Sequence, residues 1–92
     1  MKLGTVTQQP AERLSYTIDY SQFLTDGDNV QTATAAVSPV GLTVDTVSVL
    51  DPRVRFFVEG GTTGERYKVT INVETADGRQ LQDELIFKIK EI

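Results

Sequence analysis

The chain of 92 residues contains no cysteine, no histidine and no tryptophan. Without cysteine, neither a disulfide nor a thiolate zinc site can form. Without histidine, the commonest metal ligand and the usual general base near neutral pH are both missing. None of the serines can therefore join an ordinary nucleophile–base pair. The composition argues against an enzyme, and we expect no catalytic residues, no metal and no cofactor.

Long apolar runs and clustered positive charge are also missing. No run approaches the ~20 apolar residues that a membrane-spanning helix needs, and the first residues lack the apolar segment of a signal peptide. The formal net charge is −4, whereas phosphate binding requires clustered Lys and Arg. We therefore expect no contact with nucleic acid or membrane. The oligomeric state stays open.

The residues that are abundant favour strands. The chain has 11 Val, 12 Thr and 5 Ile, against only 12 Leu and Ala together, and β-branched side chains prefer the extended conformation. Apolar and polar residues alternate in several short segments bounded by turn residues, which is typical of half-buried strands. About seven such strands predict an all-β fold, an immunoglobulin-like antiparallel β-sandwich with no disulfide. Residues 1–11 are expected to form an N-terminal arm or edge strand, and residues 12–92 the sandwich domain.

The alternation also predicts which side chains fill the core. The expected core residues are Tyr16, Ile18, Val54, Phe56, Val58, Val69, Ile71, Val73, Leu85 and Phe87. The last two strands flank Asp77-Gly78 and should form a hairpin. A two-residue turn would set apolar residues against polar ones. A three-residue loop with Gly78 in the left-handed conformation pairs Val73 with Leu81 and leaves one exception, Asp83, where a local bulge or a strand end should intervene.

Two sites stand out within this framework. The spacing Gly61-x-x-Gly64-x-x-Tyr67 makes Tyr67 a candidate tyrosine corner, in which the hydroxyl bonds back to upstream backbone; the alternative is a plain core aromatic. Phe57 alternates away from the core and shares its face with Arg53 and Arg55. An aromatic among arginines is typical of protein interfaces, although a neighbouring strand or the N-terminal arm would also account for it.

The acidic residues of the first third suggest a calcium site only superficially. Asp19, Asp26 and Asp28 offer the oxygen ligands that hard cations prefer. However, Val30 and Gln31 stand where the EF-hand loop requires Asp and Gly. Aspartate also stabilises turns directly, so we interpret the segment as a solvated turn without metal.

Two blocks of sequence carry a family resemblance. They are Asp19-Tyr20-Ser21-x-Phe23-Leu24-x-x-Gly27-Asp28 and Val54-x-Phe56-x-Val58-x-Gly60-Gly61-Thr62-x-Gly64-x-x-Tyr67-x-Val69-x-x-x-Val73, followed by Asp77-Gly78-Arg79. Together they resemble small immunoglobulin-like, virion-associated structural proteins of tailed bacteriophages and prophages. The resemblance implies a sandwich without catalysis, made in the bacterial cytoplasm and incorporated in the virion, on the capsid or the tail.

The expected function is that of a non-enzymatic structural or decoration module. It would bind a phage capsid or tail protein through a sheet face, an edge strand or the N-terminal arm. The alternative is a receptor- or carbohydrate-binding module of a fibre, which should display two or more exposed aromatic rings. Five of the seven aromatic residues alternate into the expected core, which favours the structural module. These five are Tyr16, Tyr20, Phe56, Tyr67 and Phe87.

Overall fold

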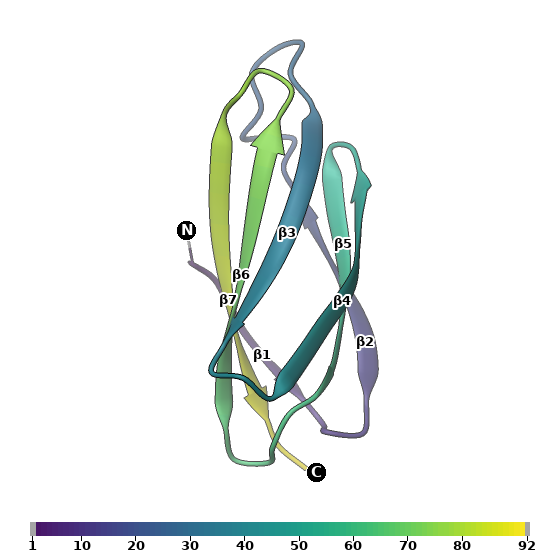
Figure 1. Cartoon of the computed structure of the whole chain (residues 1–92), viewed down its shortest axis with the longest axis vertical. Coiled ribbons are helices and arrows are strands. Elements are labelled where there is room, and N and C mark those ends of the chain that lie inside the picture. Colours follow the sequence, from purple (N-terminus) through teal and green to yellow (C-terminus); the bar gives the residue numbers. More distant parts are fainter. Residues whose placement is uncertain (1, 92) are drawn as a thin grey trace.

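The computed structural model describes residues 2–91, which form seven strands in two sheets (Figure 1). One sheet has four strands in the order β1-β7-β6-β3, and the other has three in the order β2-β5-β4. The prediction of an all-β sandwich of about seven strands is therefore confirmed. The strands are β1 Lys2–Gln8, β2 Arg13–Asp19, β3 Val30–Ser38, β4 Leu42–Leu50, β5 Arg53–Gly60, β6 Arg66–Thr75 and β7 Gln80–Ile89.

The expectation that all strands are antiparallel is wrong at one edge. β1 pairs in parallel with β7, with Thr5 opposite Ile86 and Gln8 opposite Ile89. After Gln8 the chain turns within residues 9–12 and enters β2, which belongs to the other sheet. The chain passes from β1 in one sheet to β2 in the other sheet, so β1 and β2 do not form a hairpin. The direction of β1 is therefore not set by a hairpin turn. Alternation reveals which side chains point inward, but it does not reveal the direction of a neighbouring strand.

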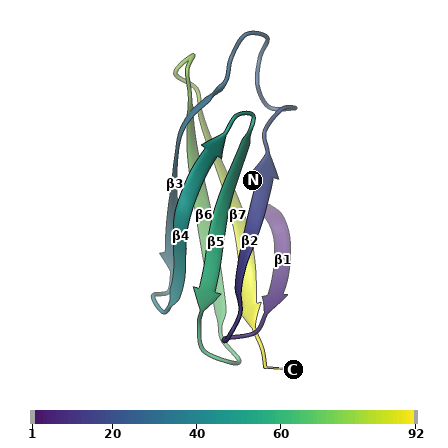
Figure 2. The same cartoon turned by 90° about the vertical axis from the view of Figure 1, so that its right-hand side faces the viewer.

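The two sheets pack face to face into an elongated body of 44 × 19 × 19 Å (Figure 2). The upper end, as drawn in Figure 1, holds the β2–β3 loop, the β4–β5 turn and the tip of the β6–β7 hairpin. Hydrogen bonds tie these three connections together. The Val30 N–H donates to Asp51 Oδ1 at 2.8 Å, and the Ala76 N–H donates to the Asn29 carbonyl at 2.9 Å.

Aromatic side chains occupy the middle of the core between the sheets. Tyr20, Phe56 and Phe87 are completely buried, and the Tyr16 ring meets the Phe87 ring edge-on at 5.1 Å. Eight of the ten expected core residues are buried, and the other two, Tyr16 and Leu85, are half-buried and pack against that cluster. Burying such rings contributes a large part of the favourable free energy of a domain this small.

The β6–β7 hairpin has the predicted register. Val73 lies opposite Leu81, and Glu74 lies opposite Gln80. The Gly78 N–H donates to the Thr75 carbonyl at 3.0 Å, and Gly78 has a φ of 87°. The three-residue loop with a left-handed glycine is therefore confirmed, because only this loop places both apolar rows on the core side.

The expected bulge at Asp83 is absent, and that expectation is wrong. Asp83 lies directly opposite Ile71 in an uninterrupted ladder, and it is 4% exposed. The hydroxyl of Tyr20, from the loop that follows β2, is buried near this carboxylate, and it has no hydrogen-bond partner within residues 2–91. Burial raises the pKa of Tyr20 far above its usual range, and Asp83 adds to this effect. The Asp83 carboxylate and the Tyr20 hydroxyl are thus two polar groups that lie near each other inside the core.

Candidate interface on the three-stranded sheet

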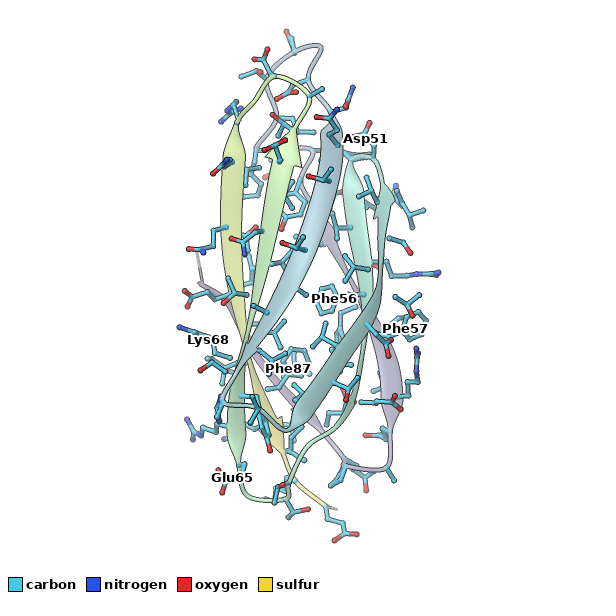
Figure 3. The ribbon with its side chains drawn as sticks, in the orientation of Figure 1. Asp51, Phe56, Phe57, Glu65, Lys68 and Phe87 are labelled. Carbon is cyan, nitrogen blue, oxygen red and sulfur yellow. The ribbon has the colours of Figure 1, made fainter. Side chains whose placement is uncertain are left out.

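The candidate interface is built on β5, the central strand of the three-stranded sheet. Val54, Phe56 and Val58 point inward and are completely buried. The residues between them point outward, so Arg53, Arg55 and Phe57 share the outer face, as the alternation indicated. Figure 3 shows the two neighbouring rings on opposite sides of the strand, with Phe56 toward the core and Phe57 away from it.

The Phe57 ring is flanked by two guanidinium groups. Arg13 Cζ lies 4.3 Å from the ring centroid, and Arg55 Cζ lies 5.5 Å from it. Both distances are within the range in which a cation is attracted to an aromatic face. The ring is half-buried, and one of the two arginines beside it, Arg13, comes from the adjacent strand β2.

Arg13 is fixed by acidic residues from the other two strands of its sheet. Its Nη2 lies 2.7 Å from Asp45 Oδ1 on β4, and its Nε lies 3.8 Å from Glu59 Oε1 on β5. Sequence reasoning missed Arg13, Asp45 and Glu59 as members of this face. Arg13 on β2 is far in the chain from β4 and β5, and only the register of β2-β5-β4 brings the three residues together. The one available signal was that Arg13 alternates away from the core.

A β-bulge in β4 borders the site. The register shifts between Asp45 and Ser48, and Thr46 has a φ of 50°, which is unusual for a β-branched residue. The Thr46 hydroxyl contacts both Asp45 Oδ1, at 3.1 Å, and Arg13 Nη2, at 3.4 Å. Bulges occur frequently at sheet edges and re-aim side chains. Here the bulge helps to hold the ion pair that covers Phe57.

Arg55 differs from Arg13 because its charge is not neutralised by an ion pair within residues 2–91. It lies between Thr17 on β2 and Ser48 on β4. Arg53 lies opposite Asp19, and its charge helps to lower the pKa of that carboxyl group, although hydrogen bonds from the backbone and hydroxyl of Ser21 contribute more. The outer face thus offers one free guanidinium group beside an aromatic ring.

Tyr67 lies at the lower end, away from this face. Its ring is 3% exposed, and its hydroxyl accepts a hydrogen bond from the Thr62 N–H at 3.0 Å. Gly61 packs so closely that a Cβ there would lie 3.2 Å from Tyr67 Cε1 and 2.7 Å from Ile89 Cγ1. Tyr67 is therefore a core aromatic whose hydroxyl also bonds to the loop before β6.

Two of the three acidic residues considered for a metal, Asp19 and Asp28, accept hydrogen bonds from the backbone. Asp19 Oδ1 accepts the Ser21 N–H, and Asp28 Oδ1 accepts the N–H groups of Asn29 and Asp77, all at 2.9 Å. Within the part of the chain that the structure describes, no three acidic side chains gather as metal ligands would. Asp28 instead fastens the β2–β3 loop to the hairpin tip.

The exposed aromatic residues do not form a platform for a sugar ring in residues 2–91. Tyr20, Phe56, Tyr67 and Phe87 are buried, and Tyr16 is half-buried. Phe23 is exposed at the upper end, far from Phe57 on the sheet face. A hollow of about 500 Å³ on the four-stranded sheet is lined without any aromatic residue, by Thr32, Thr34, Asn72, Val73, Glu74, Gln80, Leu81 and Gln82.

The fold defines a class, a small β-sandwich of two sheets. The profile of one protein family, the podophage GP4 fiber-tail adaptor protein gp77, matches residues 8–88, and the chain belongs to this family. It is a structural phage protein, as the resemblance of its sequence indicated. No curated protein matches the chain. Among residues 2–91, no helix has the length and apolar character needed to cross a membrane.

Proposed function

We propose that the chain is a non-enzymatic part of the phage tail that joins other tail proteins through protein–protein contacts. The description of its family names a fiber-tail adaptor, which supports a place on the tail over capsid decoration. The chain has no histidine and no cysteine, which supports a role without catalysis. The lack of an aromatic platform within residues 2–91 argues against a carbohydrate-binding role.

The observation that carries the proposal is the arrangement of Arg55 beside Phe57. Arg and aromatic residues are enriched in protein interfaces and dominate their energetics. Arg13 is already neutralised by Asp45, and it holds the ring in place. Arg55 has no ion-pair partner in the described chain, so its charge is available to a carboxylate of another protein. The outer face of the three-stranded sheet is therefore our proposed contact surface.

The proposal is tested in particles of the phage that encodes this chain. Particles are assembled with Arg55→Glu, with Phe57→Ala, or with Thr34→Glu as the control on the outer face of the other sheet. Mass spectrometry then measures the amounts of this chain and of fibre protein relative to a capsid protein. We expect both interface variants to lose fibre protein, and the control to retain it. Full fibre content in folded Arg55→Glu and Phe57→Ala particles would overturn the proposal.

A further inference from the structure

The strand β3 ends the four-stranded sheet and hydrogen-bonds with β6 on one side only (Figure 1). Every second residue of such an edge strand points its N–H and C=O groups away from the sheet, where a further strand can pair with them. The pairing with β6 shifts once, between Val30 and Thr32, and is regular from Thr32 to Ser38. The edge of β3 therefore offers a regular backbone over residues 32–38.

The other edge strands of residues 2–91 carry features that oppose strand pairing, and β3 does not. Natural sheets protect their edges with charged side chains, proline or bulges. The register of β1 shifts after Lys2, β2 carries Arg13 and Asp19, and β4 contains the bulge that begins at Asp45. In contrast, residues 32–38 contain no charged residue and no proline. This edge is therefore the one that accepts a further strand most readily.

The side chains that point inward from β3 are only partly covered. Ala33, Ala35 and Val37 are half-buried and pack against the core. The inward residues of β6, from Tyr67 to Val73, are at most 3% exposed. The difference arises because β6 has a strand on each side and β3 has only one. Directly opposed residues share a face, so apolar residues of an added strand would bury the inward row of β3.

The outer side of this edge shows which charges an added strand should carry. The outward side chains of residues 32–38 are small and exposed. Behind them on β6 lie two exposed charges, Glu74 opposite Thr32 and Lys68 opposite Ser38. Neither charge has an ion-pair partner within residues 2–91. The hollow of about 500 Å³, lined by Thr32 and Glu74 among others, leaves space for a long basic side chain to reach the carboxylate.

We infer that an extended segment of another tail protein adds to the edge of β3 as a fifth strand of this sheet. The segment runs antiparallel to β3, because antiparallel pairing is the more stable arrangement, and it directs apolar residues inward. Its carboxylate beside Ser38 meets Lys68, and its Lys or Arg beside Thr32 meets Glu74.

This inference rests on the proposed function only for the place of the partner in the tail. A protein that joins two others needs two separate contact surfaces. The outer face of the three-stranded sheet is assigned to the contact on which the fibre depends, whereas the edge of β3 belongs to the other sheet. The edge therefore supplies the second surface, by which the chain is attached to the tail.

A synthetic peptide tests the inferred chemistry on the full chain. The peptide has the sequence Glu-Val-Thr-Val-Thr-Val-Lys, and its control is the reversed sequence, Lys-Val-Thr-Val-Thr-Val-Glu. In antiparallel pairing, the control places like charges next to Lys68 and Glu74. We expect the first peptide to bind at about millimolar concentration, with shifted NMR amide signals and slowed hydrogen exchange in residues 32–38.

The reversed peptide should bind roughly fivefold more weakly or less tightly still, because exposed ion pairs contribute modestly. No change in the signals of β3, or equal affinity of the two peptides, would overturn the inference. Slowed exchange at this edge in the chain alone, increasing with its concentration, would show that a second copy occupies the edge and would overturn it too.

Two neighbouring substitutions distinguish strand pairing from a general effect of charge. Ala35→Lys places a charge on the inward side of the edge, which opposes strand addition. Ala36→Lys places the same charge on the exposed outer side. Circular dichroism verifies that both variants are folded. Ala35→Lys should abolish peptide binding, and Ala36→Lys should retain it. Equal loss of binding in the two folded variants would contradict strand pairing at β3.

Phage particles separate this inference from the proposed function. Particles assembled with Ala35→Lys should lose this chain relative to a capsid protein, whereas particles with Arg55→Glu should keep this chain and lose fibre protein. Mass spectrometry measures both amounts. A full amount of this chain in folded Ala35→Lys particles would overturn the inference and leave the proposed function intact. Full fibre content in Arg55→Glu particles would overturn the proposed function and leave the edge contact intact.

Discussion

The hydroxyl of Tyr16 donates a hydrogen bond of 2.6 Å to the side-chain carbonyl of Gln8, a residue only 1% exposed. The amide nitrogen of the same Gln8 donates to the Val58 carbonyl at 2.8 Å and to the Glu12 carbonyl at 3.1 Å. Gln8 belongs to β1 of the four-stranded sheet, whereas Tyr16 and Val58 belong to the three-stranded sheet. One buried amide therefore links the two layers where the chain crosses between them.

Replacing Gln8 by Leu should lower the free energy of unfolding by about 1–3 kcal/mol. The substitution leaves the Val58 carbonyl and the Tyr16 hydroxyl without their partner, and the cost of an unsatisfied buried polar group is of that order. Urea unfolding followed by circular dichroism gives the measurement. Tyr16→Phe serves as the comparison and should cost less, because it removes only one of these hydrogen bonds. An unchanged urea midpoint for Gln8→Leu would contradict the linking role.

Two glycines with nearly the same backbone conformation should respond differently to alanine. Gly78 has a φ of 87° and open space where a Cβ would lie, so Gly78→Ala should cost only the left-handed strain of about 1 kcal/mol. Gly61 has a φ of 91°, and its Cβ would lie 2.7 Å from Ile89 Cγ1. Gly61→Ala should therefore cost clearly more, by the additional strain of an overpacked core. Equal unfolding free energies for the two variants would be inconsistent with the close packing around Gly61.

Alanine substitutions of the adjacent residues Phe56 and Phe57 should lower the free energy of unfolding by very different amounts. Phe56 is completely buried, and Phe56→Ala should lower the free energy of unfolding by ~3–5 kcal/mol. Phe57 lies on the outer face between Arg13 and Arg55, and Phe57→Ala should cost much less, because it loses mainly cation–aromatic contacts worth about 0.5–1 kcal/mol each at exposed sites. Thermal melting of both variants makes the comparison. A larger loss for Phe57→Ala would mean that the faces of β5 are assigned wrongly.

Stability should fall in acid because of Asp28. Burial alone would raise the pKa of Asp28, but the nearby Thr75 hydroxyl, the hydrogen bonds from the Asp77 and Asn29 N–H groups and the charge of Arg79 lower it below its ordinary value of 3.8. A carboxyl group whose pKa is depressed in the folded state stabilises the fold above the unfolded pKa, and this contribution is lost as pH falls through the folded pKa. Asp28→Asn should therefore flatten the decline of the urea midpoint below pH 4.

The control for this experiment is Asp26→Asn, which removes one acidic group from the same loop. Asp26 accepts none of the backbone hydrogen bonds that Asp28 accepts. If the urea midpoint of Asp28→Asn declines below pH 4 as steeply as that of the wild-type chain, Asp28 does not stabilise the loop by its charge.

The local features of the fold could be predicted from sequence because they depend on neighbouring residues. Alternation assigns Phe56 to the core and Phe57 to the surface, since side chains change faces at every residue of a strand. The same rule decided the register of the last hairpin, because a shift by one residue would set the apolar row from Tyr67 to Val73 against polar residues.

Features that join distant strands could not be predicted in this way. Arg13 covers Phe57 only because β2 and β4 flank β5, and nothing in the sequence near Arg13 shows which strand lies beside it. Asp83 interrupts the apolar pattern of β7, and the sequence could not show that the polar hydroxyl near it comes from Tyr20, more than sixty residues earlier. The role of Gln8 in linking the two sheets could not be predicted either, because its partners Val58 and Tyr16 lie on strands of the other sheet.

The most direct measurement is a cryo-electron microscopy reconstruction of the tail of the phage that encodes this chain. The account predicts that the outer face of the three-stranded sheet is covered by another tail protein, with a carboxylate of that protein at Arg55 and apolar or aromatic contact on Phe57. A reconstruction in which this face is open to solvent, while the chain is held in the tail by another surface, would contradict it.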